Sequence, residues 1–207
     1  MFLGPENTKS NFTRGAAAKS LLLHVSTHAV ADLANPENSR LVFSPDRNAE
    51  DASYVFLREL YDMDLRHVRM ATISACDTER GRLVRGEGVQ GFSRALLSVG
   101  AQSALTTLWK VDDQATAEFM HQFYFYALNQ HQPRAQALRL AKLAFLRSSQ
   151  YSHPRFWAAF VLSGEGQTPL PRVISWTSLL LLAGYLYIAG MLLLWFGVHR
   201  RRRLHRA

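Results

Sequence analysis

Short runs of apolar residues recur along the chain and predict the buried strands of a sheet. Each run is too short for a typical helix and rich in aliphatic or β-branched residues, which favours strands covered on both faces. The four clearest runs are Leu21–Ser26, Val68–Ala75, Ser103–Trp109 and Trp157–Leu162. A further short strand is expected at Arg40–Ser44.

Longer stretches between these runs show the spacing of amphipathic helices. The predicted helices are Tyr54–Tyr61, Glu87–Gly100, Asp113–Leu128 and Pro133–Leu146. Gly100 is expected to cap the second of them, because glycine accepts the backbone conformation that ends many helices. Strands that alternate with helices indicate an α/β fold, in which a mostly parallel sheet is flanked by helices.

The C-terminal part of the chain has a different pattern. No charged residue occurs from Val173 to Val198, and this run exceeds the roughly 20 residues that a helix needs to cross a bilayer. Trp176 and Trp195 lie near its two ends, as interfacial anchors do. We therefore expect a globular domain at 1–166, a linker at 167–172, a transmembrane helix at 173–198 and a basic tail at 199–207.

Positive charge is concentrated in that tail. Of the formal net charge of +8, five charges come from the last residues of the chain, which leaves +3 for the rest. These five are Arg200, Arg201, Arg202, Arg203 and Arg206. The distribution argues against a nucleic-acid partner and for membrane lipid around residues 173–198. The positive-inside tendency favours a cytoplasmic tail on a single-pass membrane protein, and leaves the side of the globular domain open.

A cysteine and a histidine form the candidate catalytic pair. Cys76 is the single cysteine, so an intrachain disulfide and a cysteine-based zinc site are excluded, and we expect no metal and no cofactor. His28 follows the first buried strand and Cys76 follows the second. If the strands are neighbours, the imidazole can take the thiol proton and leave a thiolate nucleophile. The backbone N–H groups of Ala29 and Cys76 are candidates for stabilising the oxyanion.

Five segments together resemble the CHAT domain family, whose members are caspase-like. The segments are LHVSTH (23–28), TISACDT (72–78), GEGVQGFSRALLSVG (86–100), AQSALTTLWKVD (101–112) and HPRFWAAFVLSG (153–164). The resemblance covers about residues 4–164 and implies a caspase-type α/β fold with a His/Cys dyad, which maps onto His28 and Cys76. In caspases, too, the histidine lies about 50 residues upstream of the cysteine. Because the family is often fused to tetratricopeptide repeats, such a repeat or another partner module is an expected partner.

Two residues depart from the family pattern. Ala29 stands where the family usually has glycine after the histidine, and Asp77 stands where glutamate is common. Alanine still supplies the backbone N–H but tolerates a positive φ less well. Family members normally have further residues before the region that matches 4–12, so we expect this chain to be a shortened member.

Other polar residues have two interpretations each. Asp77 and Glu79 either accept a basic substrate side chain or belong to a solvated loop, which is favoured. Trp109 and Asp112 follow the third strand, and either form a wall of the substrate pocket or serve as core packing and a helix N-cap. His24 lies four residues before His28, where a metal pair is conceivable, but without a carboxylate cluster a structural role is favoured.

The sequence thus predicts a membrane-anchored, caspase-like cysteine endopeptidase. It would cleave a protein or peptide substrate through a thioester intermediate on Cys76. The alternative is a catalytically weak interaction or signalling scaffold of the same fold at the membrane. A third hypothesis is a module that binds anionic lipid through the arginines of the tail.

Overall fold

The computed structural model describes residues 4–17, 20–32, 34–45, 53–74 and 87–172, together with 184–185, 187–188 and 190–191. The chain divides into two units, Met1–Leu170 and Pro171–Ala207, each of which is described by itself. Among the described residues of either unit, we find no helix with the length and apolar character needed to span a membrane. Most of the predicted transmembrane segment at 173–198, and all of the tail at 199–207, lies outside the described residues.

The main sheet of the first unit has four described strands, in the order β1-β5-β6-β7. Their bounds are β1 Leu22–Ser26, β5 Met70–Ser74, β6 Ser103–Thr107 and β7 Phe160–Gly164. The pairs β1–β5 and β5–β6 are parallel, and β7 pairs antiparallel with β6. The predicted α/β architecture with a mostly parallel sheet is therefore confirmed.

A smaller antiparallel sheet lies beside the carboxyl end of β1. It consists of β2 Ala29–Val30, β3 Arg40–Val42 and β4 Tyr54–Phe56, in that order. The helix predicted from Tyr54 is wrong in its first half, because Tyr54–Phe56 pairs with β3 and the helix begins only at Leu57. The guanidinium of Arg40 lies over the ring of Tyr54, 5.0 Å from its centroid, a cation–π contact that stabilises the strand pairing.

Helices cover both faces of the main sheet. They are α1 Lys9–Ala17, α2 Leu57–Leu60, α3 Glu87–Ser98, α4 Asp113–Tyr124 and α5 Arg134–Leu146. A π-helical turn at Phe125–Asn129 follows α4. Short 3₁₀ turns occur at Gly4–Glu6, Pro36–Asn38 and Pro154–Phe156. The predicted cap of α3 is confirmed, since Gly100 has φ of 105° and its N–H donates to the carbonyl of Leu97.

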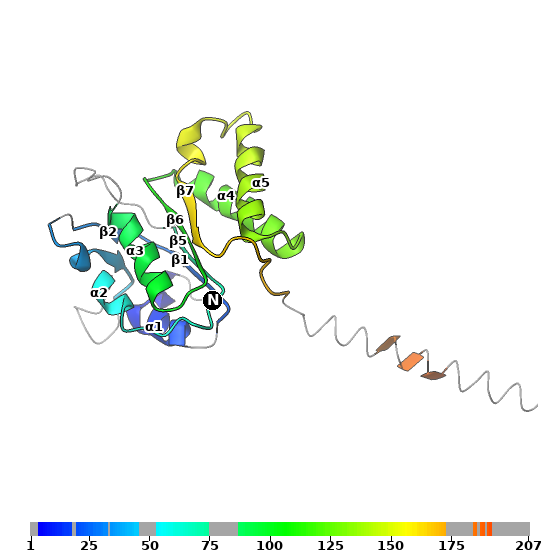
Figure 1. Cartoon of the computed structure of the whole chain (residues 1–207), viewed down its shortest axis with the longest axis horizontal. Coiled ribbons are helices and arrows are strands. Elements are labelled where there is room, and N and C mark those ends of the chain that lie inside the picture. Colours follow the sequence, from blue (N-terminus) through cyan, green and yellow to red (C-terminus); the bar gives the residue numbers. More distant parts are fainter. Residues whose placement is uncertain are drawn as a thin grey trace, which may run out of the picture. The chain divides into compact units, whose positions relative to one another are not determined.

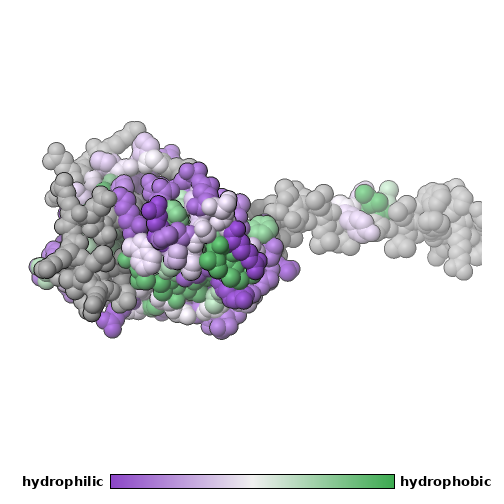
Figure 2. Space-filling model, turned by 90° about the horizontal axis from the view of Figure 1, so that it is seen from above, coloured by the Kyte–Doolittle hydropathy of each residue, from purple (hydrophilic) through white to green (hydrophobic). Residues whose placement is uncertain are grey.

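Alternate residues of β1, β5 and β6 enter two separate cores, which gives the first unit three layers. Val25, Ile73 and Ala104 pack with residues of α1, α2 and α3. Met70 and Leu105, which point to the other face, pack with α4 and α5. Figure 1 shows α1–α3 on one side of the strands and α4 and α5 on the other. On the face seen in Figure 2, a hydrophobic area lies next to polar side chains.

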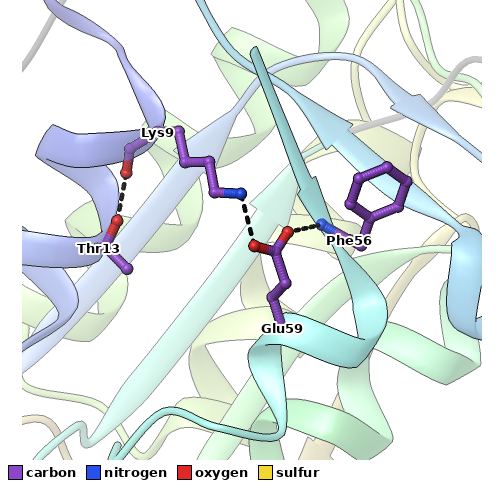
Figure 3. A network of polar contacts seen from close by, with 4 residues as sticks. All are labelled: Lys9, Thr13, Phe56 and Glu59. Carbon is purple, nitrogen blue, oxygen red and sulfur yellow. Dashed lines mark hydrogen bonds and ion pairs between the residues drawn. The ribbon is translucent and has the colours of Figure 1, made fainter. Parts of the chain in front are cut away.

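A polar network ties the N-terminal helix to the small sheet (Figure 3). Lys9 on α1 donates to Oε1 of Glu59 at 2.5 Å, and Oε2 of Glu59 accepts from the backbone N–H of Phe56 at 2.8 Å. Thr13 donates to the carbonyl of Lys9, which closes the network on α1. Burial of Glu59 opposes its ionisation, but the hydrogen bonds from Lys9 and Phe56 outweigh that effect and lower its pKa.

Candidate active site

The carboxyl edge of the sheet brings the ends of β1 and β5 together. The two strands are direct neighbours, as the predicted dyad requires, and Ser26 pairs with Ser74 at the last step of the ladder. His28 follows Ser26 by two residues, and Cys76 follows Ser74 by two residues. Cys76, Asp77 and Glu79 lie outside the described residues, so the predictions for these three side chains stay predictions.

The backbone of His28 is fixed by the small sheet. Its carbonyl accepts a hydrogen bond from the N–H of Val42 at 2.8 Å, and the hydroxyl of Thr27 donates to the carbonyl of Val42. These two bonds anchor the segment after β1 to β3, while the side chain of His28 stays exposed. The imidazole of His28 therefore extends from a backbone that these two hydrogen bonds hold in place.

The pairing also determines where the N–H of Ala29 points. Ala29 lies opposite Leu41 of β3, and the bond from Val42 to His28 flanks this pair. In an antiparallel ladder such flanking bonds mark a non-hydrogen-bonded pair, whose N–H groups point away from the partner strand. The N–H of Ala29 is thus turned away from β3, an orientation that an oxyanion donor requires.

A cavity of about 490 Å³ opens beside His28. It lies between the carboxyl ends of the parallel strands and the first turns of α4. The strands and the segments after them contribute His24, Ser26, Thr27, His28, Ser74 and Thr107. The α4 side contributes Lys110, Val111, Asp113, Thr116, Ala117 and Met120. Hydroxyl groups and imidazoles on the strand side make it a polar cavity, open to a ligand that forms hydrogen bonds.

Two predicted pocket residues have structural contacts instead of cavity contacts. The side chain of Asp112 caps α4 by accepting from the N–H of Ala115 at 3.0 Å. Trp109 packs against the core under α4 and α5, and its Nε1 donates to the carbonyl of Arg155 at 3.0 Å. Neither is among the residues that line the cavity, whereas Asp113, the next residue along, is. Of their two interpretations, the packing and capping roles agree with these positions.

His24 lines the cavity, although its place in the sequence favoured a structural role. Its Nδ1 lies 3.3 Å from the hydroxyl of Tyr124 on α4, and that hydroxyl lies 3.1 Å from the hydroxyl of Thr72 on β5. Partial burial of the ring lowers the pKa of His24, although the residue as a whole is exposed, and burial raises the pKa of Tyr124 to about 12. Within the described residues, no group of three or more His, Cys, Asp and Glu side chains could hold a metal ion.

The signal for His24 in the sequence is its position on the strand. It is two residues before Ser26 and four before His28, so the three residues alternate onto one face if the strand continues. Its partner Tyr124 is a hundred residues away, and no local pattern could connect the two.

Comparison with known proteins gives a family and two relatives. The family model of the CHAT domain matches residues 1–165. Tetratricopeptide repeat protein 28 of Mus musculus is 37% identical over 104 residues, and that of Homo sapiens is 35% identical over 103 residues. Each match covers 50% of this chain and 4% of the relative, so this chain corresponds to a small part of these relatives.

Comparison with solved structures finds a chain titled "Structure of Protease". It aligns with a TM-score of 0.47 and 12% sequence identity. The alignment covers 79% of this chain and 37% of that chain.

Proposed function

Because the chain belongs to the CHAT domain family, whose model matches residues 1–165, we propose that it is a caspase-like cysteine endopeptidase with His28 and Cys76 as its dyad. The observation that carries the proposal is the register of β1 and β5. Ser26 pairs with Ser74, and the two dyad residues follow this pair by the same two positions. Two peptide links keep each Cα within about 7.6 Å of its strand end, and paired strands lie about 4.8 Å apart.

The proposed reaction begins with proton transfer from the thiol of Cys76 to His28. The thiolate attacks the carbonyl carbon of the substrate peptide, and the N–H groups of Ala29 and Cys76 stabilise the oxyanion. His28 then gives its proton to the leaving amine as the C–N bond breaks, which leaves a thioester on Cys76. A water molecule, deprotonated by His28, hydrolyses the thioester and restores the thiol.

The membrane anchor is a second part of the proposal. It rests on the uncharged run from Val173 to Val198 and on the arginines that follow it. We expect the full chain to stay with the membrane fraction in alkaline carbonate, and a chain that ends at residue 172 to be released. Release of both chains would contradict the anchor without affecting the dyad.

A catalytically weak scaffold is the second candidate function. It is supported by Ala29, which stands in place of the usual glycine, and by two relatives that are named for tetratricopeptide repeats. In this case the cavity would bind a partner segment without cleaving it. The two candidates differ in one measurable property, the reactivity of Cys76.

Labelling by a small thiol reagent tests the dyad. We expect iodoacetamide to label Cys76 of the full chain rapidly at pH 7, and His28→Ala to slow labelling by about 100-fold, because general-base assistance typically contributes 10²–10⁴-fold. The matched control is His121→Ala, which removes an exposed imidazole on α4 outside the cavity and should label at the original rate. Equal labelling of the His28→Ala protein would overturn the dyad and favour the scaffold.

A further inference from the structure

The cavity beside His28 holds a second imidazole that the dyad does not use. We propose that His24 is a specificity-determining residue, which forms a hydrogen bond with the end of a long, uncharged polar side chain of a bound peptide, such as glutamine. This inference rests on the proposed function in one respect, that the peptide backbone binds at the edge beside His28.

His24 lies further from the carboxyl edge of the sheet than His28. Both residues line it, and the four residues of separation place their Cα atoms at most about 14 Å apart. His24 pairs with Thr72 within the sheet, whereas His28 follows the end of the strand. A side chain that enters beside His28 must therefore be long to reach His24, and a short side chain such as alanine cannot.

Contacts with α4 and β5 fix the orientation of the His24 ring. Nδ1 is 3.3 Å from the Tyr124 hydroxyl, which is itself 3.1 Å from the Thr72 hydroxyl. The rings of His24 and Tyr124 also pack at 5.6 Å between centroids. Because Nδ1 is directed to Tyr124, Nε2 is the nitrogen left for a molecule in the cavity.

The charges around the cavity favour a neutral ligand group near His24. α4 begins at Asp113, near the carboxyl edge of the sheet. Its last residue, Tyr124, contacts His24, so the helix runs from that edge towards His24. The α4 residues between these two that line the cavity are uncharged: Thr116, Ala117 and Met120. Asp113 and Lys110 are oppositely charged and lie near the start of the helix. Burial lowers the pKa of His24, which keeps the ring neutral at pH 7 and suited to a neutral polar partner.

Peptide binding to the full chain tests this inference without cleavage. Three fluorescent peptides that differ only in one central residue (Gln, Leu or Ala) are titrated into the Cys76→Ala protein, and anisotropy gives each Kd. We expect the Gln peptide to bind about tenfold tighter than the other two, the effect of one well-formed hydrogen bond. Adding His24→Leu should remove this preference and leave the Kd of the Leu and Ala peptides unchanged.

Two further variants separate a binding role from a structural one. His24→Gln keeps a neutral hydrogen-bonding group and should retain most of the preference, and His121→Ala should retain all of it. An equal loss of affinity for all three peptides in the His24→Leu protein would show a merely structural role and overturn the inference. So would the absence of any preference for Gln, or of any binding.

Labelling of Cys76 by iodoacetamide distinguishes this inference from the proposed function. The reagent is too small to contact His24 while it reacts with Cys76, so Cys76 of the His24→Leu protein should be labelled at the original rate. A Gln preference that depends on His24 in a protein whose Cys76 is unreactive would reject the endopeptidase and retain the inference. Rapid labelling that depends on His28, without a Gln preference, would support the endopeptidase and reject the inference about His24.

Discussion

The two ends of the main sheet use polar side chains in opposite ways. At the amino end, the guanidinium of Arg134 is almost completely buried, with 1% of the residue exposed. It donates to the carbonyl of Arg69 at 2.5 Å, to the hydroxyl of Ser103 at 3.1 Å, and to the carbonyl of Thr168 at 3.1 Å. A buried charge is tolerated only when such hydrogen bonds replace water, so the polar groups around Arg134 have a structural role.

At the carboxyl end, the polar groups border an open cavity. His24, Ser26 and His28 are all exposed and line this cavity. The backbone here is also held in place, since the N–H of Val42 donates to the carbonyl of His28. The contrast shows that polar residues of a sheet have a structural role where buried partners satisfy their hydrogen bonds, and form a candidate site where they border a cavity.

The largest effect is expected for the loss of the buried Arg134 side chain. Replacing Arg134 by alanine removes a buried side chain and leaves the carbonyls of Arg69 and Thr168 without these donors, which should lower the free energy of unfolding by about 3–5 kcal/mol. Urea denaturation of the chain measures the loss. The control is Arg139→Ala on the same helix, an exposed side chain that should cost no more than about 0.5 kcal/mol. Similar midpoints for the two variants would contradict the structural role of Arg134.

A matched pair of serines sharpens the comparison. Ser103 is fully buried, donates to the carbonyl of Arg69 at 3.0 Å and accepts from Arg134, whereas Ser26 is exposed at the cavity. Ser103→Ala should cost about 1–2 kcal/mol in urea denaturation, because it leaves buried groups unpaired. Ser26→Ala should cost less than about 0.5 kcal/mol. If the two substitutions cost the same, the two ends of the sheet do not differ as described.

The positions of strands and helices were predictable where one apolar run or one amphipathic stretch corresponds to a single strand or helix. The strands β1, β5 and β6 and the helices α3 and α5 begin and end within two residues of the predicted bounds. Here the hydrophobic period, the caps and the tertiary packing agree. Asp112 shows the same agreement, since an aspartate before an amphipathic run is found as the N-cap of α4.

Prediction was less successful where tertiary contacts override local preference. The expected strand at Trp157–Leu162 begins only at Phe160, because residues 154–156 form a 3₁₀ turn and Nε1 of Trp157 donates to the carbonyl of Ser152. The two-residue strand β2 is too short to have a pattern. The helix expected to run to Leu128 changes to a π-helical turn at Phe125–Asn129, which amphipathic spacing does not reveal.

The candidate site was predictable as an edge of the sheet but not as a cavity. Strand ends alone placed His28 at the carboxyl edge, whereas the neighbour relation of β1 and β5 required the structure. Asp113 rather than Asp112 lines the cavity because the first residue of α4 turns towards the strands while the cap turns back to its own helix. The contact between His24 and Tyr124 depends on how α4 packs on the sheet, which no spacing in the sequence specifies.

The smallest expected effect on stability concerns Tyr124, whose side chain connects α4 to His24 on β1 and Thr72 on β5. Tyr124→Phe removes the hydroxyl next to His24 and Thr72 and should cost about 1 kcal/mol near pH 8. Burial raises the pKa of Tyr124 to about 12 in the folded state, whereas an unfolded tyrosine ionises near pH 10. Its contribution to stability is therefore complete below pH 10 and is lost as the pH rises towards 12, by about 1.4 kcal/mol at pH 11.

The two stability curves should consequently cross. The phenylalanine variant lacks this loss, so the original chain is the more stable of the two at pH 8 and the less stable at pH 11. Urea midpoints at pH 8, 9, 10 and 11 give the crossing, and His121→Ala serves as a control in which an exposed α4 residue changes and the curve stays parallel to that of the original chain. Parallel curves for Tyr124→Phe as well would mean that the hydroxyl is solvated in the folded state. In that case Tyr124 would not restrain the ring of His24, and the ring would be less ordered than its contacts indicate.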